Sequence, residues 1–394
     1  MITSISPPRA QAEESLALYI HWPFCLSKCP YCDFNSHVRE RIPTERFIAA
    51  LRRELAYEAN LLGRRKLTSI FFGGGTPSLM PPEGVAALIS DAQTLFKAAF
   101  DIEITLEANP TSVEAERLSG FRDAGVNRIS LGIQSLRDDA LAFLGREHSA
   151  RQAISALEMA RGLFPRVTFD LIYARPGQSL TDWRAELDQA LTLVADHVSL
   201  YQLTIEQGTR FEGLHRQGRI VLPDEDLAAA LYAETGEIAA RHGLMAYEVS
   251  NYASPGAESR HNLTYWHYRD YLGIGPGAHG RVTRSNELRA TRRHRAPEIW
   301  ADLVERTGSG QTDAELLETG DRAREMLLMG LRLSEGVEGA WFRTRTGMTL
   351  DEAIDDEILT MCLQEGYLER RNDRLRATPE GRLRLEAILP RLVV

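Results

Sequence analysis

Short apolar runs rich in β-branched residues alternate with longer stretches of helical periodicity over the first 245 residues of the chain. Strands are predicted at residues 16–22, 67–72, 101–106, 128–133, 167–173 and 197–203, and helices at residues 44–62, 82–98, 112–124, 149–163, 181–195 and 224–242. Strands that alternate with helices pair in parallel through right-handed connections. The pattern therefore predicts an α/β fold, and its six strand–helix units favour a partial (β/α)6 barrel related to the TIM barrel. A doubly wound open sheet has the same alternation, and periodicity alone does not separate the two.

Two of the predicted helices begin with capping boxes, at residues 111–114 and 149–152. In this motif the first and fourth side chains satisfy amide donors that have no partner inside the helix. Gly125 and Gly243 are predicted to end two helices, because glycine adopts the left-handed conformation after a helix at little cost.

The pattern changes after residue 245. A strand-like run at 246–252 leads into a loop rich in glycine, proline and aromatic residues, and an arginine-rich stretch follows at 289–295. The remaining chain is helical apart from residues 366–378, which are predicted to form the two-stranded wing of a winged-helix-like domain. We therefore expect three parts, namely a barrel over 1–245, a connecting extension over 246–295 and a smaller C-terminal domain over 296–394.

The charge of the chain makes nucleic acid a poor partner. The net charge is −9, and residues 296–394 hold 13 Lys and Arg against 20 Asp and Glu. Phosphates would repel such a surface, so the C-terminal domain is expected to be a lid or an interface and not a DNA-binding module. The chain has no apolar run long enough to span a membrane, and its first 15 residues lack the features of a secretory signal. We expect it in the cytoplasm.

Three of the four cysteines lie within eight residues in the spacing C-x3-C-x2-C, namely Cys25, Cys29 and Cys32. Three cysteines cannot pair off as disulfides and a cytosolic chain is reduced, so the group is expected to bind metal or to be redox-active. Three thiolates leave one iron of a [4Fe–4S] cluster without a protein ligand, whereas electron-transfer clusters have four. A zinc site with His21 or His37 is the alternative, although the spacing is a poor match for a zinc ribbon. The remote Cys362 lies in a predicted helix and is assigned no role.

Polar residues and glycines follow several of the predicted strands. The second strand ends in Gly-Gly-Gly-Thr-Pro at residues 73–77, the third in Glu107 and the fourth in Gln134, while Asp170 lies on the fifth. Active sites of barrels form at the C-terminal ends of the strands, so these residues are expected to lie together. The glycine run is not a P-loop, because no Gly-Lys-Ser/Thr follows it. Taken alone it is typical of a tight turn, but beside the cysteines its amides are well placed for a cofactor carboxylate or amine.

The C-x3-C-x2-C motif after the first strand resembles the signature of radical SAM enzymes, whose partial barrels cleave S-adenosylmethionine reductively. In that family the open iron binds the methionine amine and carboxylate. The chain is most similar to the oxygen-independent coproporphyrinogen III oxidase-like branch, in five blocks: Tyr-Ile-His-Trp-Pro-Phe-Cys at 19–25, Gly-Gly-Gly-Thr-Pro at 73–77, Leu-Glu-Ala-Asn-Pro at 106–110, Ser-Leu-Gly-Ile-Gln-Ser at 130–135 and Phe-Asp-Leu-Ile-Tyr at 169–173.

The resemblance implies roles for residues along the barrel. Those that match cofactor-contacting positions are Tyr19, Gly74, Gly75, Thr76 and Glu107. Those that match positions contacting a second S-adenosylmethionine in the oxidase are Gln134, Arg146 and Asp170. The match does not decide between one and two cofactor molecules.

Two departures separate the chain from the oxidase and make it more similar to the HemW-type heme chaperones of the same branch. The oxidase carries another cysteine two residues after the third cluster ligand, where this chain has Phe34. The chain also has only 24 residues before Cys25, fewer than the N-terminal extension that helps the oxidase to enclose its substrate.

The hexapeptide His-Asn-Leu-Thr-Tyr-Trp at 261–266 resembles the HNxxYW heme-binding motif of these chaperones. A neutral imidazole is a common axial ligand of heme iron, so the resemblance makes His261 the expected ligand. Tyr265 and Trp266 offer flat apolar faces to a macrocycle. Taken alone, the hexapeptide is typical of a surface histidine in an aromatic loop. The arginines at 289–295 could pair with heme propionates, but a solvated basic face is the simpler interpretation.

Two functions are compatible with the resemblance, and whether the chain is an enzyme is left open. The favoured one is a heme chaperone that holds a [4Fe–4S] cluster and S-adenosylmethionine and delivers heme to respiratory or other heme proteins. Some such recipients are membrane-bound, so transient contact of this protein with a membrane is compatible with the chaperone function. A heme donor protein and a homodimer are left open. The alternative is an oxygen-independent coproporphyrinogen III dehydrogenase, in which a 5′-deoxyadenosyl radical abstracts hydrogen from the propionates and protoporphyrinogen IX forms.

Overall fold

The structure is a computed structural model, and it describes residues 15–111, 114 and 116–393. The N-terminal residues, from which the absence of a secretory signal was predicted, lie almost entirely outside the described residues. Part of the capping box at 111–114 also lies outside them.

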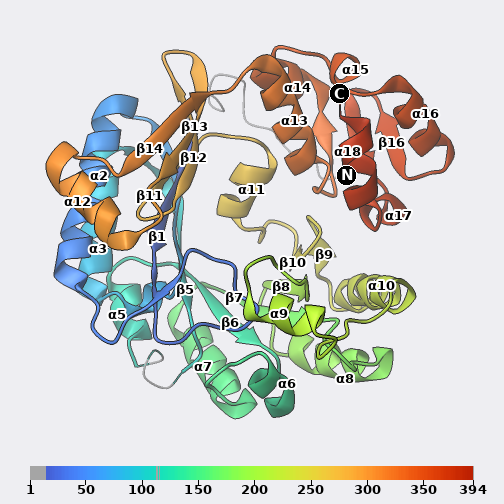
Figure 1. Cartoon of the computed structure of the whole chain (residues 1–394), viewed down its shortest axis with the longest axis horizontal. Helices are drawn as coiled ribbons and strands as arrows, with labels where there is room; N and C mark the ends of the chain where they lie inside the picture. Colours follow the sequence, from blue (N-terminus) through green and yellow to red (C-terminus); the bar gives the residue numbers. More distant parts are fainter. Residues whose placement is uncertain (1–14, 112–113, 115, 394) are drawn as a thin grey trace.

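Six parallel strands, in the order of the sequence, form the centre of a twelve-stranded sheet (Figure 1). They are β1 (Ser15–Trp22), β4 (Lys66–Gly74), β5 (Lys97–Ala108), β6 (Arg128–Gln134), β7 (Arg166–Tyr173) and β8 (His197–Gln202). Each pairs in parallel with the next. A doubly wound sheet reverses its strand order, whereas a sequential order with right-handed connections puts the helices on one face. The prediction of a partial barrel is therefore confirmed.

Helices connect these strands, and the long ones cover the outside of the sheet (Figure 1). In chain order they are α2 (Thr44–Leu62), the 3-10 helix η1 (Pro77–Leu79), α3 (Pro82–Leu95), α5 (Leu118–Asp123), α6 (Asp138–Phe143), α7 (Ala150–Leu163), α8 (Leu180–Leu191), α9 (Arg210–Arg216) and α10 (Glu225–Arg241). The capping box of α7 is present, because Ser149 accepts from the Gln152 amide and the Gln152 side chain accepts from the Ser149 amide. Helix α2 has the predicted bounds and buries Phe47, Leu51 and Leu55 at helical spacing.

Short strands extend both edges of the parallel sheet. Next to β1 lies the parallel strand β11 (Tyr271–Ile274), followed by the antiparallel strands β12 (His279–Arg284), β13 (Glu287–Arg293) and β14 (Gln311–Leu316). Next to β8 lie β10 (Asn251–Ala253) and β9 (Met245–Ala246). The predicted single strand at 246–252 is wrong: β9 and β10 are antiparallel, with Tyr252 opposite Ala246. The chain reverses between them because the Glu248 carboxylate accepts the Ser250 amide at 2.7 Å.

The arginine-rich stretch is not simply a solvated face, because it alternates along β13. Arg292 is exposed, whereas the Arg293 side chain is fully buried. Its guanidinium lies 3.3 Å from a Glu54 oxygen and 3.0 Å from a Glu58 oxygen, both on α2. The solvated-face interpretation is therefore wrong for Arg293. The pairing ties the sheet extension to α2 and to α12 (Pro297–Thr307), whose Trp300 donates to Glu54 at 3.1 Å.

The C-terminal region has a core of its own, which includes Leu327, Leu331, Phe342 and Leu375. Its elements are α13 (Thr319–Gly330), β15 (Val337–Glu338), α14 (Gly339–Thr346), α15 (Leu350–Ala353), α16 (Asp356–Gln364), β16 (Leu368–Arg371), β17 (Arg374–Ala377), α17 (Pro379–Arg382) and α18 (Leu385–Leu392). Strands β16 and β17 pair antiparallel, as predicted for the wing, and β15 adds a third strand beside β17. Cys362 is buried within α16, as expected. The division of the chain at residues 245 and 295 stays a prediction, and the large sheet itself continues to Leu316.

Candidate functional site

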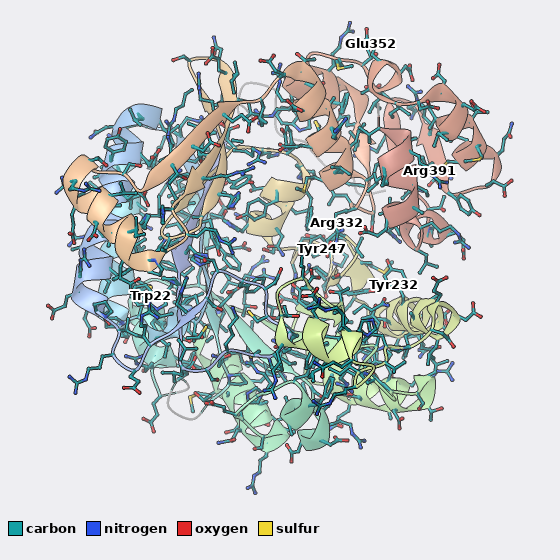
Figure 2. All side chains as sticks on the ribbon, in the orientation of Figure 1. Trp22, Tyr232, Tyr247, Arg332, Glu352 and Arg391 are labelled. Carbon is teal, nitrogen blue, oxygen red and sulfur yellow. The ribbon has the colours of Figure 1, made fainter. Side chains whose placement is uncertain are left out.

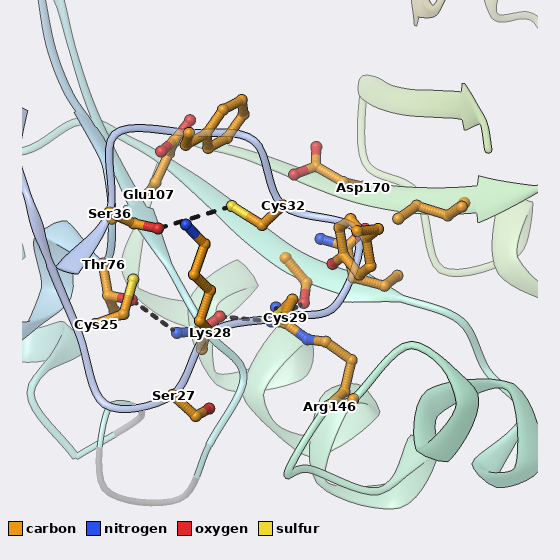
Figure 3. A pocket seen from close by; sticks show the side chains of 18 of the residues that line it. Cys25, Ser27, Lys28, Cys29, Cys32, Ser36, Thr76, Glu107, Arg146 and Asp170 are labelled. Carbon is orange, nitrogen blue, oxygen red and sulfur yellow. Dashed lines mark hydrogen bonds between the residues drawn. The ribbon is translucent and has the colours of Figure 1, made fainter. Parts of the chain in front are cut away.

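The cysteines lie on one loop at the C-terminal end of β1 (Figure 3). Strand β1 leads into β2 (Phe24–Cys25), which pairs in parallel with β3 (His37–Val38) and so closes the loop that holds Cys29 and Cys32. The Asn35 side chain donates to the carbonyls of Pro276 and Arg295, at 2.9 Å each. The loop is therefore held at both ends by the sheet and its extension.

Polar side chains lie beside all three thiols (Figure 3). The Thr76 hydroxyl donates to Cys25 Sγ at 3.4 Å, Arg146 Nη1 donates to Cys29 Sγ at 3.3 Å, and Cys32 Sγ lies 3.9 Å from Ser36 Oγ. Burial raises the pKa of Cys25 and Cys32, so both thiols are protonated in this state. Iron that binds here would displace these protons.

The donor set fits an iron–sulfur cluster better than a single ion. Within the described part of the chain, no three His, Cys, Asp or Glu side chains are close enough together to hold one metal ion. The alternative of a zinc site with His21 is disfavoured further because both nitrogens of that ring already have partners, Tyr19 OH and the Asn35 carbonyl. A four-iron cluster places each thiolate on a different iron, so its ligands stand apart, as three cysteines spread along one loop do.

The glycine run at the end of β4 allows a close approach to the end of β1. Gly74 has φ of +114°, and a Cβ there would lie 2.6 Å from the His21 ring. A Cβ on Gly75 would lie 2.7 Å from the Phe24 carbonyl oxygen. The Gly75 amide donates to the Trp22 carbonyl at 2.7 Å. Glycine is therefore required at positions 74 and 75 for steric reasons, independently of any ligand.

A cavity of about 540 Å³ lies over these strand ends and is called the first cavity here. The predicted residues that line it are Cys25, Cys29, Cys32, Gly74, Gly75, Thr76, Glu107, Gln134, Arg146 and Asp170. The structure thus brings together ten of the predicted site residues, which come from five different strands and their loops.

Two of the acidic residues that line the first cavity, Glu107 and Asp170, are predicted site residues. Burial, together with the charge of Asp170, raises the pKa of Glu107 to about 8. Burial raises the pKa of Asp170 to about 6. Neither side chain forms an ion pair with another described residue. The Glu107 carboxyl group is therefore mostly protonated at neutral pH, and a cationic group of a ligand beside it would favour its ionised form.

Arg146 lies beside the cysteines, and its charge also acts on Asp170, whose pKa it lowers against the effect of burial. Its Nη2 donates to the Gly132 carbonyl at 2.9 Å and to the side chain of Asn109. Sequence reasoning did not single out Asn109, which also donates to Thr76 at 3.4 Å and so links the cysteine loop to β5. Its position two residues after Glu107, within the Leu-Glu-Ala-Asn-Pro block, was the available signal.

A second cavity, of about 850 Å³, shares Gly74, Glu107 and Phe34 with the first. Tyr19 lines this second cavity and not the first. Its hydroxyl donates to His21 Nδ1 at 3.0 Å, because His21 Nε2 is 3.0 Å from the Asn35 carbonyl and must carry the ring proton. Burial lowers the pKa of His21 to about 4, so the ring is neutral.

The hexapeptide at 261–266 forms the helix α11 (Arg260–Trp266), which separates the second cavity from a third. Tyr265 lines the second cavity, and Trp266 lines the third, which has a volume of about 840 Å³. His261 lines none of the three. Its side chain is buried, with Nδ1 2.9 Å from Ser69 Oγ and Nε2 2.7 Å from Tyr265 OH.

The environment of His261 has a chemical consequence. Phe71 stacks on the ring at 4.8 Å between centroids, and burial lowers the pKa of His261 to about 3. The imidazole is therefore neutral, as an iron ligand must be, but both of its nitrogens are already in use. The interpretation of the hexapeptide as a surface histidine in an aromatic loop is wrong, because the segment is helical and the ring is buried.

Comparisons with known proteins give the family. Residues 19–190 match the family model of the Radical SAM superfamily, and residues 317–384 match that of the HemN C-terminal domain. The chain is 41% identical over 391 residues to the Bos taurus protein named radical S-adenosyl methionine domain-containing protein 1, mitochondrial, covering 96% of this chain and 88% of that one. It is 38% identical over 382 residues to heme chaperone HemW of Haemophilus influenzae, covering 95% of this chain and 97% of that one. The chain belongs to the HemW family of radical SAM proteins.

The fold has a counterpart among solved structures. The coproporphyrinogen III oxidase HemN of Escherichia coli superposes with a TM-score of 0.80 and 21% identity, covering 96% of this chain and 90% of that one. Membership of the radical SAM superfamily implies a [4Fe–4S] cluster and S-adenosylmethionine as cofactors. Within residues 15–111, 114 and 116–393, no helix is both long and apolar enough to cross a membrane.

Proposed function

We propose that this protein is a heme chaperone, which binds heme and delivers it to proteins that require heme. The observation that carries the proposal is the match to HemW over nearly the whole of both chains, at 38% identity. Phe34 gives further support, because it occupies the position where the resembling oxidase has an additional cysteine. Its ring is exposed and lines both the first and the second cavity.

We propose Cys25, Cys29 and Cys32 as the ligands of the cluster. All three are free thiols on a loop that lines the first cavity, and they provide one ligand fewer than a cubane has irons. When bound, the cluster supplies an open iron for the amine and carboxylate of S-adenosylmethionine. Arg146 donates to Cys29 Sγ and so helps to hold that side chain in place.

Residues of the strand ends would hold S-adenosylmethionine. Gly74, Gly75 and Thr76 line the first cavity beside Cys25, and Glu107 offers a carboxyl group to ribose hydroxyls or to the cofactor amine. Tyr19 would act from the second cavity, where its hydroxyl is held by His21. The residues proposed for a second cofactor molecule are Gln134, Arg146 and Asp170, which line the same cavity.

The helix α11 is proposed to serve heme through the aromatic side chains of its hexapeptide. Tyr265 lines the second cavity and Trp266 the third, so the cavity that holds the macrocycle decides which of the two contacts it. His261 would become an iron ligand only after Tyr265 releases Nε2, and until then it fixes the Tyr265 hydroxyl. The proposal also includes heme recipients, among them membrane-bound respiratory proteins. It further includes a heme donor, a homodimer and a location in the cytoplasm.

The experiment is a transfer assay with the full chain after anaerobic reconstitution of the cluster. The protein is loaded with hemin, separated from free hemin and mixed with an apo-cytochrome, whose holo spectrum is followed. We expect heme transfer from the wild type. A parallel anaerobic incubation with S-adenosylmethionine, a reductant and coproporphyrinogen III is expected to give no protoporphyrinogen IX. Formation of that product would identify the alternative function, the dehydrogenase, and failure to load hemin would exclude the chaperone.

A further inference from the structure

The third cavity lies where α11 and the β9–β10 hairpin face the C-terminal region, and Figure 2 places Tyr247 and Arg332 at this junction. Its apolar lining includes Met245, Leu263, Trp266, Met326 and Trp341. The volume of about 840 Å³ lies within the range of sites that bind small molecules and cofactors. The lining is therefore suited to a large ligand with flat apolar faces.

Arg269 brings a positive charge to this cavity, and the charge of Glu335, which also lines it, acts on the guanidinium. It lines the cavity, and its Nε is buried without a hydrogen-bond partner. Among the described residues no carboxylate forms an ion pair with it, and its guanidinium lies 5.6 Å from the centre of the Trp341 ring. Burial, and then the nearby Arg345, lowers the pKa of Arg269, and the charge of Glu335 opposes this. The side chain is partly buried and its Nε has no acceptor among the described residues, so a carboxylate of a ligand would find a free donor there.

The carboxylates around the same cavity are already engaged. Glu335 lies 2.6 Å from His267 Nε2, and Glu338 lies 3.4 Å from Arg374. Glu258 accepts the Gly256 amide at 3.3 Å. The indole nitrogen of Trp266 is a second buried donor without a partner. Two donors thus remain for an acceptor that the described residues do not provide.

We infer that the third cavity is the heme site, in which Arg269 pairs with a heme carboxylate and Trp266 and Trp341 contact the macrocycle. This inference rests on the chaperone function proposed above, and it locates heme on the side of α11 that faces away from the cysteines. Heme combines what the cavity offers, because it is flat, largely apolar and carries two carboxylates.

The second cavity is the competing location. It is lined by His279, His294, Arg292 and Arg295, and so it is also basic. Arg292 and Arg295 are exposed and remain hydrated, and the buried Arg293 is already paired with Glu54 and Glu58. Exposed charges contribute little to binding, whereas a desolvated and unpaired cation contributes more. The third cavity is therefore favoured.

The test uses the full chain with its cluster and compares Arg269→Gln with Arg292→Gln, which removes a cation from the second cavity. Hemin and iron-free protoporphyrin IX are titrated against each protein, and tryptophan fluorescence quenching and difference absorbance give the affinity. We expect Arg269→Gln to weaken the binding of both porphyrins about tenfold or more, because both lose the same charge-assisted bond. Arg292→Gln should change either affinity less than about threefold.

Two further measurements separate recognition from misfolding. Without porphyrin, Arg269→Gln should have about the stability of the wild type, because Arg269 forms no ion pair with a buried carboxylate among the described residues. Arg269→Lys keeps the charge and should retain most of the affinity. The inference is overturned if Arg269→Gln binds hemin like the wild type, or if Arg292→Gln alone weakens binding. In either case a wild type that still loads and transfers heme leaves the chaperone function standing, whereas a wild type that does not bind hemin overturns both.

Discussion

The first and third cavities differ in the ionisable side chains that line them. The first holds Glu107 and Asp170, whose pKa values are raised by burial, so that Glu107 is mostly protonated at neutral pH. The third holds Arg269, which has no carboxylate paired with it among the described residues. S-adenosylmethionine carries a sulfonium and an ammonium group, and heme carries two carboxylates. A cationic group beside Glu107 would favour its ionised form, and a carboxylate beside Arg269 would give the guanidinium a direct partner.

The two cavities also differ in how the chain builds them. The first is assembled from the ends of consecutive parallel strands, so its residues occur at regular intervals along the sequence. The third is assembled from one helix, one short hairpin and the C-terminal region, which come from separate parts of the chain. A site of the first kind is visible in a sequence, whereas a site of the second kind requires the tertiary fold.

The largest expected effect is the loss of the iron–sulfur cluster, which tests whether the first and third cavities are separate sites. Cys25→Ser, Cys29→Ser or Cys32→Ser should each remove most of the cluster, because hydroxyl groups replace thiolates as iron ligands only poorly. Iron and acid-labile sulfide per chain, measured after anaerobic reconstitution, check this. Cys362→Ser is the matched control and should keep a full cluster, since Cys362 lies in the separate C-terminal core. Hemin binding should survive in all four variants, and its loss together with the cluster would contradict the separation of the sites.

The next effect compares two buried arginines, one with partners and one without. Arg293→Met leaves the buried Glu54 and Glu58 without their cation, which should cost about 3–5 kcal/mol of unfolding free energy. Arg269→Met should be neutral or stabilising, because no buried carboxylate loses a partner. The exposed Arg292→Met serves as the control. Urea denaturation of the three variants and the wild type measures the difference, and equal losses for Arg293 and Arg269 would show that the contrast between them is not real.

Much of the fold was predictable because it depends on local patterns. The six parallel strands and the bounds of α2 follow from the alternation of apolar runs and helical periodicity. The hairpin of β9 and β10 was not predictable, because the turn depends on the Glu248 side chain and the strands depend on pairing with β8. The burial of Arg293 was missed for a similar reason, since its partners are on α2, more than 200 residues earlier.

The candidate site was predictable to the extent that it lies on strand ends. The cysteines, Glu107 and Asp170 were all found in this way, and all line the first cavity. The orientation of His261 could not be found, because it depends on a hydrogen bond to Ser69 on the neighbouring strand β4. Arg269 carried no signal at all, since an arginine in a loop is ordinary until its lack of a partner is seen.

A smaller effect tests the raised pKa of Glu107 in the first cavity through the pH dependence of stability. The pKa of Glu107 is raised from 4.5 to about 8, so the folded protein keeps a proton that the unfolded chain releases. Its contribution to stability is full below pH 4.5 and is lost as the pH rises towards 8. In the cluster-free protein, the unfolding free energy of the wild type should therefore fall with pH more steeply than that of Glu107→Gln, by at most about 1.4 kcal/mol per pH unit. Identical slopes in urea denaturation at several pH values would rule this out.

The smallest effect concerns the wall of the third cavity. Trp341 donates to the His267 carbonyl at 2.8 Å, and Trp341→Phe should cost about 1 kcal/mol of unfolding free energy for this bond. Trp183→Phe is a matched control, because Trp183 donates to Thr235 at the same distance of 2.8 Å but lies in the barrel core. The two variants should lose similar stability and keep the cluster, yet only Trp341→Phe should weaken hemin binding, by a few-fold. If both variants or neither weakens hemin binding, the aromatic wall has no specific part in recognition, and Arg269 would have to account for the heme site without it.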